Sequence, residues 1–153
     1  MRSLIGIGLA VAVFGLAGCG KKAGTSGPDG APAAAGIEGG WTLVSIETGG
    51  EKVPDAKLGT PADKKVKATA DKLIFTKGGK EDPATYKIDH SKTPNEIDIT
   101  DTKENGESAT MYGICKLEGD TFTVCTSTAS ANRPKEFKTA PGSDAAIMIF
   151  KKD

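Results

Sequence analysis

Only four residues of this 153-residue chain carry a thiol or an imidazole: three cysteines and one histidine. Cys19 follows an apolar run, Cys115 and Cys125 lie close together in the second half, and His90 stands alone in a polar stretch. A metal site or a catalytic dyad needs several such groups at a set spacing. The His-Glu-x-x-His, Gly-x-Ser-x-Gly and phosphate-loop motifs are absent. We therefore expect no catalytic residue, no metal, no cofactor and no enzymatic activity.

Cys19 completes the sequence Leu16-Ala17-Gly18-Cys19, which matches the lipobox of bacterial lipoproteins at every position. Before it, a short positively charged segment precedes an apolar run over residues 4–16. A helix of about thirteen residues spans about 20 Å, too short for the roughly 30 Å hydrocarbon core of a bilayer. Such a run is typical of an export signal. We predict a signal peptide over residues 1–18, followed by Cys19, whose thiol takes up a diacylglycerol that carries fatty acyl chains such as palmitate.

The segment after Cys19 is predicted to be a flexible tether. Residues 20–36 contain no large apolar or aromatic side chain, so they cannot bury enough surface to offset the entropy of ordering. A flexible chain of this length has an r.m.s. reach of roughly 20–25 Å. The chain thus divides into a signal peptide (1–18), a lipidated cysteine with a Gly/Ala/Pro linker (19–36) and one folded domain (37–153). The lipid would hold this domain on the cell membrane or outer membrane, facing the periplasm or the extracellular side.

The charge balance bears on the class of partner. The chain has 20 basic and 20 acidic residues, a formal net charge of +0. Nucleic-acid-binding domains carry an excess or a patch of basic residues, so nucleic acid is not an expected partner. The expected link to the membrane is the N-terminal lipid rather than charge, and the identity of any protein partner is left open.

The folded domain shows short runs of alternating apolar and polar residues separated by turn residues, as in β-strands. The predicted strands are centred on residues 41–46, 65–70, 73–75, 85–89, 96–100, 111–117, 122–125, 136–138 and 145–150. Gly59 and Pro61 limit any helix within 54–65 to a turn. The first and last strands are apolar on both faces, as expected where they pair to close a barrel. We predict an all-β, antiparallel up-and-down barrel of about eight to nine short strands, although a sandwich explains the alternation nearly as well.

The two later cysteines flank a predicted hairpin turn at residues 119–120. A two-residue turn there places Cys115 opposite Val124, whereas Cys125 lies opposite Ile114 on the other face of the hairpin. This register disfavours a Cys115–Cys125 disulfide, because the two side chains point apart. A three-residue loop with a bulge would instead pair the cysteines directly. The favoured register predicts one thiol in the core, at Cys115, and one on the surface, at Cys125.

Six segments of the predicted domain carry a family resemblance. They are IEGGWTLVS (37–45), GEKVP (50–54), DHSKTPNEIDIT (89–100), GICKLEGDT (113–121), RPKEF (133–137) and PGS (141–143). In this order they resemble a lipocalin-like domain family that is abundant in planctomycete bacteria, and the similarity covers about residues 37–151. Gly39-x-Trp41 is also similar to the Gly-x-Trp signature of true lipocalins, whereas their Thr-Asp-Tyr signature is absent.

The resemblance implies a lipocalin-like barrel in which Trp41 closes one end beneath a basic residue near the last strand, with Arg133 and Lys151 as the candidates. It supplies no established activity. By analogy with the fold, the barrel would bind a small hydrophobic or amphipathic ligand. The candidate barrel-lining residues are Trp41, Phe75, Tyr86, Met111, Phe122 and Phe137, and the small residues Ala68, Ala70 and Gly113 would leave room for a cavity. The alternative is a barrel filled by its own side chains that serves as a structural or interaction module of the envelope.

Overall fold

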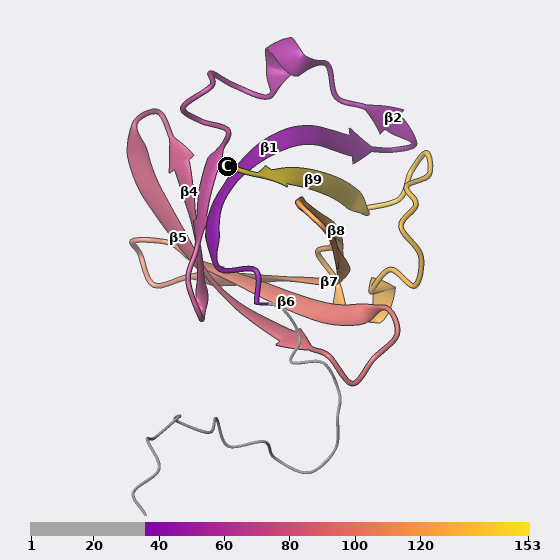
Figure 1. Cartoon of the computed structure of the whole chain (residues 1–153). Coiled ribbons are helices and arrows are strands. Elements are labelled where there is room, and N and C mark those ends of the chain that lie inside the picture. The colour runs from indigo at the N-terminus through magenta and orange to yellow at the C-terminus, as the bar shows by residue number, and fades with distance from the viewer. Residues whose placement is uncertain (1–35) are drawn as a thin grey trace, which may run out of the picture. The chain divides into compact units, whose positions relative to one another are not determined.

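The computed structural model describes residues 36–153 (Figure 1). The predicted signal peptide, the lipobox Leu16-Ala17-Gly18-Cys19 and the linker up to residue 35 lie outside these described residues. Among residues 36–153, no helix combines the length and the apolar character needed to cross a membrane.

Antiparallel strands make up most of the described chain, and eight of them close into a barrel (Figure 1). The elements are β1 (Gly39–Thr48), β2 (Glu51–Lys52), the 3-10 helix η1 (Asp55–Lys57), β3 (Lys65–Ala68), β4 (Lys72–Lys77), β5 (Lys80–Asp89), β6 (Asn95–Thr102), β7 (Ser108–Glu118), β8 (Thr121–Ser127), the 3-10 helix η2 (Ser130–Asn132) and β9 (Ala146–Lys152). From β3 to β9 each strand pairs with the next, β1 pairs with β3, and β1 with β9 closes the ring. The short β2 pairs with β1 as an additional strand. The predicted up-and-down barrel is therefore confirmed, and the sandwich alternative is wrong.

A bulge explains why the first strand is apolar at irregular spacing. In its pairing with β9, strand β1 has one extra residue, Val44, which lies between Leu43 and Ser45 and has no partner on β9. The shift places Ile46 opposite Met148, a residue that packs against the barrel core. Leu43 and Ile46 therefore face the interior although they are three residues apart, and Val44 is left 38% exposed. Simple alternation cannot predict this arrangement.

The end of the barrel where β1 begins is here called the base. The β3–β4, β5–β6 and β7–β8 turns and the end of β9 lie at this end, as the strand registers require. Trp41 seals it: its indole Nε1 donates a 2.7 Å hydrogen bond to the carbonyl oxygen of Ile37, and its ring centroid lies 5.8 Å from that of Phe122. The base is thus closed by side chains of the domain itself.

The basic residue over Trp41 is neither of the two candidates drawn from the family resemblance. Lys152 holds its Nζ 5.8 Å from the Trp41 ring centroid. Alternate residues of a strand face opposite sides, so Lys152 shares the inner face with Phe150, whereas Lys151 points outward and donates to the hydroxyl of Thr121. The other candidate, in the segment before β9, contacts the outer wall of the barrel and is described below.

The segment between β8 and β9, residues 128–145, is here called the strap. The predicted short strand around Phe137 is wrong, because residues 135–137 form a bend in the strap and the Lys138 amide donates to the nearby Glu136 carbonyl. Phe137 also does not line the barrel. It packs on the outer face of the wall against a cluster of Ile114, Cys125 and Ile147, which alternation along the strands turns away from the interior.

Candidate functional site

The barrel interior is occupied by side chains of its own wall. Twelve buried residues form one continuous inner core: Ile37, Trp41, Val66, Ala68, Leu73, Ala84, Ile97, Ile99, Cys115, Phe122, Val124 and Phe150. The Phe122 ring packs on both other core aromatics, with its centroid 5.8 Å from that of Trp41 and 6.0 Å from that of Phe150. All three rings are at most 4% exposed. A ligand inside the barrel would have to displace side chains of this inner core.

Five of the six candidate lining residues face this inner core. Trp41 and Phe122 belong to it, and Phe75, Tyr86 and Met111 are partly buried and pack against it. The sixth, Phe137, packs on the outer face of the wall instead.

The small residues do not hollow out the barrel as expected. Ala68 is part of the inner core, and Ala70 is exposed beyond the end of β3. At Gly113, an added Cβ would collide with the carbonyl oxygen of Cys125 on the neighbouring strand. Glycine is therefore needed there for close packing of the wall rather than for ligand space.

The two described cysteines are free and lie on opposite faces of the β7–β8 hairpin. Cys115 is opposite Val124 and Cys125 is opposite Ile114, the register of a two-residue turn. Burial raises the pKa of the Cys115 thiol to about 12. Burial also raises the pKa of the Cys125 thiol. Neither thiol is therefore an activated nucleophile.

Cys125 is not the surface thiol that the hairpin register predicted. Its exposed fraction is 0%, and it forms an outer cluster with Ile114 and Ile147 on the outside of the wall. Phe137, Ala145 and Ile149 complete the packing around this cluster. The reason is tertiary: the strap lies over this part of the wall and shields it from water. The same covering explains why β9 is apolar on both faces.

Arg133 fastens the strap to the outer wall. Its Nη2 lies 2.6 Å from Asp98 Oδ1 and its Nε 3.6 Å from Glu96 Oε2, both on β6. Its Nη1 donates a 2.8 Å hydrogen bond to the carbonyl oxygen of Gly113, and its guanidinium carbon lies 5.5 Å from the Tyr112 ring centroid. A guanidinium engaged by carboxylates, a carbonyl and an aromatic face is held in one position.

Two further contacts hold the other parts of the strap. The Thr139 hydroxyl donates a 2.6 Å hydrogen bond to Glu47 Oε1 on β1 and accepts one from the Gly50 amide. Asp144 Oδ2 accepts a 2.6 Å hydrogen bond from the Ser127 hydroxyl at the end of β8. This bond is the main reason why the pKa of Asp144 lies below its usual value. The strap is thus attached at both ends and in the middle.

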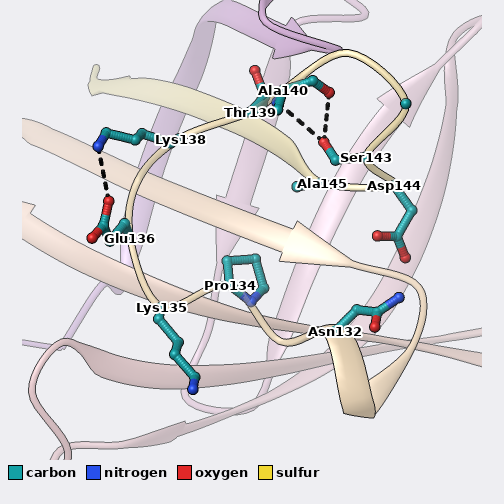
Figure 2. Close-up of a pocket in the computed structure, with 11 residues that line it drawn as sticks. Asn132, Pro134, Lys135, Glu136, Lys138, Thr139, Ala140, Ser143, Asp144 and Ala145 are labelled. Carbon is teal, nitrogen blue, oxygen red and sulfur yellow. Dashed lines mark hydrogen bonds and ion pairs between the residues drawn. The ribbon is translucent and has the colours of Figure 1, made fainter.

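The strap surrounds an open hollow with a volume of about 810 Å³. Figure 2 shows the strap as an arch, with Pro134, Lys135 and Glu136 on one arm and Ser143 and Asp144 on the other. The hollow is lined by the strap's own residues, which carry charged groups of both signs, hydroxyls and small apolar side chains.

A second, smaller cavity of about 160 Å³ lies at the base. Its walls include Ile37, Ile88 and Phe122, and the solitary His90 stands at its edge in the β5–β6 turn. The same histidine also borders a neighbouring depression of about 360 Å³ that reaches Gly36. His90 is therefore an exposed loop residue, as its polar surroundings in the sequence suggested, but one that adjoins two hollows.

Several residues of these sites escaped the sequence reasoning. Continued alternation from Phe150 would have singled out Lys152 as the residue over Trp41. No comparable local signal marks Thr139 or Asp144, because their partners lie on strands far away in the sequence. Within residues 36–153, no group of three or more His, Cys, Asp or Glu side chains is placed to hold a metal ion. Comparison of the chain with protein-family models, curated proteins and solved structures found no match.

Proposed function

We propose that this chain is a lipid-anchored lipoprotein of the bacterial cell envelope whose lipocalin-like barrel is a non-enzymatic interaction module. In this proposal Cys19 carries the lipid and residues 20–36 form the tether. The barrel is a rigid support that presents the strap to another envelope component, on the periplasmic or the extracellular side of the membrane.

The strap is the observation that carries this proposal. Loops of this length without strands are uncommon in compact domains and usually serve a function. Arg133, Thr139 and Asp144 hold the strap in one conformation around its hollow. A loop that is ordered before binding loses little conformational entropy when a partner docks, which favours affinity.

The packed interior argues against a carrier that holds its ligand in the middle of the barrel. Pockets for ligands of drug-like size have volumes of about 300–1,000 Å³. Inside the barrel this space is taken by the twelve buried side chains of the inner core, among which Phe122 is tilted against Trp41 and stacked on Phe150 near the base. Of the two functions expected by analogy with the fold, the filled module therefore fits the geometry better.

Membership of the planctomycete-type lipocalin-like family is part of the proposal. Its support is the closed ring of eight antiparallel strands, together with the base, where Trp41 of the Gly39-x-Trp41 sequence packs beneath Lys152. A basic residue above the sealing tryptophan is what the resemblance implied, although at a different position from the two candidates.

Photocrosslinking from the strap tests the interaction role. A photoreactive amino acid replaces exposed Lys135 in the strap or, as a control, exposed Lys67 on β3, which lies across the ring from β7. Each variant is expressed as the full-length chain in a bacterial host. We expect a defined envelope component to crosslink from position 135 but not from position 67, and Arg133→Gln to abolish this product. Equal crosslinking from both positions would contradict the proposal.

Substitution of the lipobox cysteine tests the anchor. Cys19→Ala should abolish incorporation of labelled palmitate and move the protein from the detergent phase to the aqueous phase, because the thiol that accepts the lipid is gone. Cys115→Ala is the matched control and should leave palmitate incorporation unchanged. Membrane partition that persists in Cys19→Ala would refute lipid attachment at this residue.

A long-chain fluorescent fatty acid separates the filled module from the carrier. With the inner core in place, we expect no saturable binding and no change in Trp41 emission. Saturable binding accompanied by quenching of Trp41 would favour the carrier instead.

A further inference from the structure

The base cavity is bordered by side chains from several separate parts of the chain. Ile37 precedes β1, Ile88 and His90 come from the end of β5 and the turn after it, and Asn95 begins β6. The remaining lining residues, Cys115, Lys116, Leu117 and Phe122, belong to the β7–β8 hairpin. The cavity lies where these turns meet, at the end of the barrel that Trp41 seals.

Size limits what this cavity can hold. Its volume is about 160 Å³. A cavity of about 150 Å³ lined by leucine, isoleucine and phenylalanine is known to hold a single benzene ring. Ligands of drug-like size occupy pockets of about 300–1,000 Å³, so this cavity by itself has no room for a long acyl chain or a fused ring system. One six-membered ring matches the available space.

The deep wall of the cavity is apolar. Ile37, Cys115 and Phe122 are each at most 3% exposed, and Leu117 and Ile88 are partly buried against the inner core. Burial raises the pKa of the Cys115 thiol to about 12, so the sulfur is neutral and behaves as a small apolar group. A ring placed here contacts aliphatic and aromatic carbon on several sides.

The rim of the cavity is polar, but the charge of Lys116 is already paired. The ammonium Nζ of this lysine lies 2.8 Å from Glu118 Oε2 and 5.3 Å from the Phe137 ring centroid. The amide of Asn95 supplies two N–H donors and one acceptor. In the β5–β6 turn, Asp89 and Ser91 hydrogen-bond to each other, which leaves the His90 imidazole outside that network. A neutral hydroxyl group suits these two rim side chains.

We propose that the base cavity binds a neutral single-ring aromatic molecule with one hydroxyl group, that is, a ligand of the phenol class. The ring lies against Ile88, Leu117 and Phe122, and the hydroxyl is directed toward Asn95 and His90. A ring substituent can extend into the neighbouring depression of about 360 Å³, which shares Ile37, Ile88 and His90 with the cavity. This site goes beyond the interaction role of the strap and does not depend on it.

Solution NMR with phenol itself tests the proposal. The sample is the full-length chain carrying Cys19→Ser, which removes the predicted lipid and leaves Cys115 and Cys125 as the thiols. We expect saturable binding, with nuclear Overhauser effects between the phenol ring protons and the methyl groups of Ile88 and Leu117. The methyl groups of Ile147 in the outer cluster should show none.

A matched pair of variants locates the site. Leu117→Trp fills the cavity, whereas Leu43→Trp makes the same change at another partly buried, inward-facing leucine that does not line it. We expect Leu117→Trp to raise the dissociation constant of phenol at least about tenfold, because the ring would clash with the new side chain. Leu43→Trp should leave the constant within about twofold.

A separate variant, which leaves the cavity open, tests the contact to the hydroxyl group. Asn95→Ala should weaken phenol binding about fivefold, the effect of losing one hydrogen bond, and should leave the binding of toluene unchanged. Toluene that binds as tightly as phenol to the unsubstituted chain would overturn the assigned ligand class. Absence of contacts to Ile88 and Leu117, or phenol binding that survives Leu117→Trp, would overturn the site.

Discussion

The β7–β8–β9 wall has two buried faces that arise in different ways. On the inner face, Cys115 is 2% exposed within the inner core, and its neighbours alternate regularly along the strands. On the outer face, Cys125 is 0% exposed, yet this face would be open to water without the strap. Two thiols on adjacent strands are thus equally buried, one by closure of the barrel and the other by a loop laid over it.

The difference shows what each kind of burial depends on. The inner face is covered by all eight strands of the ring, so it is lost only when the barrel opens. The outer face is covered by one segment held by Arg133, Thr139 and Asp144. Local opening of that segment exposes the outer cluster while the barrel stays folded. The inner face should therefore follow global stability, and the outer face should follow the contacts of the strap.

Phe122→Ala should have the largest effect, because it removes a buried aromatic ring that packs on both Trp41 and Phe150 in the inner core. We expect a loss of about 3–5 kcal/mol in the free energy of unfolding, the usual range for such a cavity. Urea denaturation followed by circular dichroism measures it. A loss below about 1 kcal/mol would mean that the ring does not support the core.

Arg133→Gln should have the second-largest effect. We expect it to lower the free energy that keeps the strap closed by about 2 kcal/mol, because hydrogen bonds made by a charged group are lost. The rate of Cys125 alkylation in the folded protein should rise about tenfold or more, while that of Cys115 stays the same.

Lys138→Gln is the matched control for Arg133→Gln. It removes an ion pair with Glu136 in which both side chains are largely exposed, so neither alkylation rate should change. Equal acceleration of both thiols in Arg133→Gln would show that the two faces open together, and the comparison would fail.

Phe137→Ala repeats the phenylalanine-to-alanine change on the outer face. This ring is only partly buried, so we expect a loss of about 1–2 kcal/mol, clearly less than for Phe122→Ala. Urea denaturation of both variants under the same conditions compares the two faces directly. Similar losses for the two substitutions would indicate that the strap is part of the global folding unit.

Acid should have the smallest effect, through Asp144. The hydrogen bond from Ser127 lowers the pKa of this carboxyl group below its usual value of 3.8. A lowered pKa means that the ionised group stabilises the folded strap above pH 3.8 and that this contribution is lost as the pH falls through the folded value. Below pH 3.8, Cys125 should therefore react faster with 4,4′-dithiodipyridine relative to Cys115. Asp144→Asn should remove this pH dependence, and an unchanged profile would contradict the role of the carboxylate.

The barrel strands could be predicted because their signals are local. All eight were placed from alternation and turn residues, and the two-residue turn at 119–120 gave the observed register of β7 and β8. The single turn of helix at Asp55–Lys57 also lies within the stretch limited by Gly59 and Pro61. In each case the information lies within a few residues of the element itself.

The parts that could not be predicted depend on contacts between distant segments. Phe137 stands between charged residues as it would in a strand, but it packs against the outer cluster on the outside of the wall. Cys125 has the alternation of a surface position and becomes buried because the strap covers it. The bulge at Val44 and the base cavity likewise arise from how strands and turns meet in space.

By itself, the sequence determined the all-β class, the order of the barrel strands and the hairpin register, because alternation and turn residues act over a few positions. Its N-terminal residues also predict an exported, lipidated chain through the motif that ends at Cys19. Tertiary structure alone decided that Lys152 covers Trp41, that the strap buries Cys125, and where the strap hollow and the base cavity form. The physical reason is that a strand pattern specifies which side chains share a face, whereas only the folded chain specifies what covers that face.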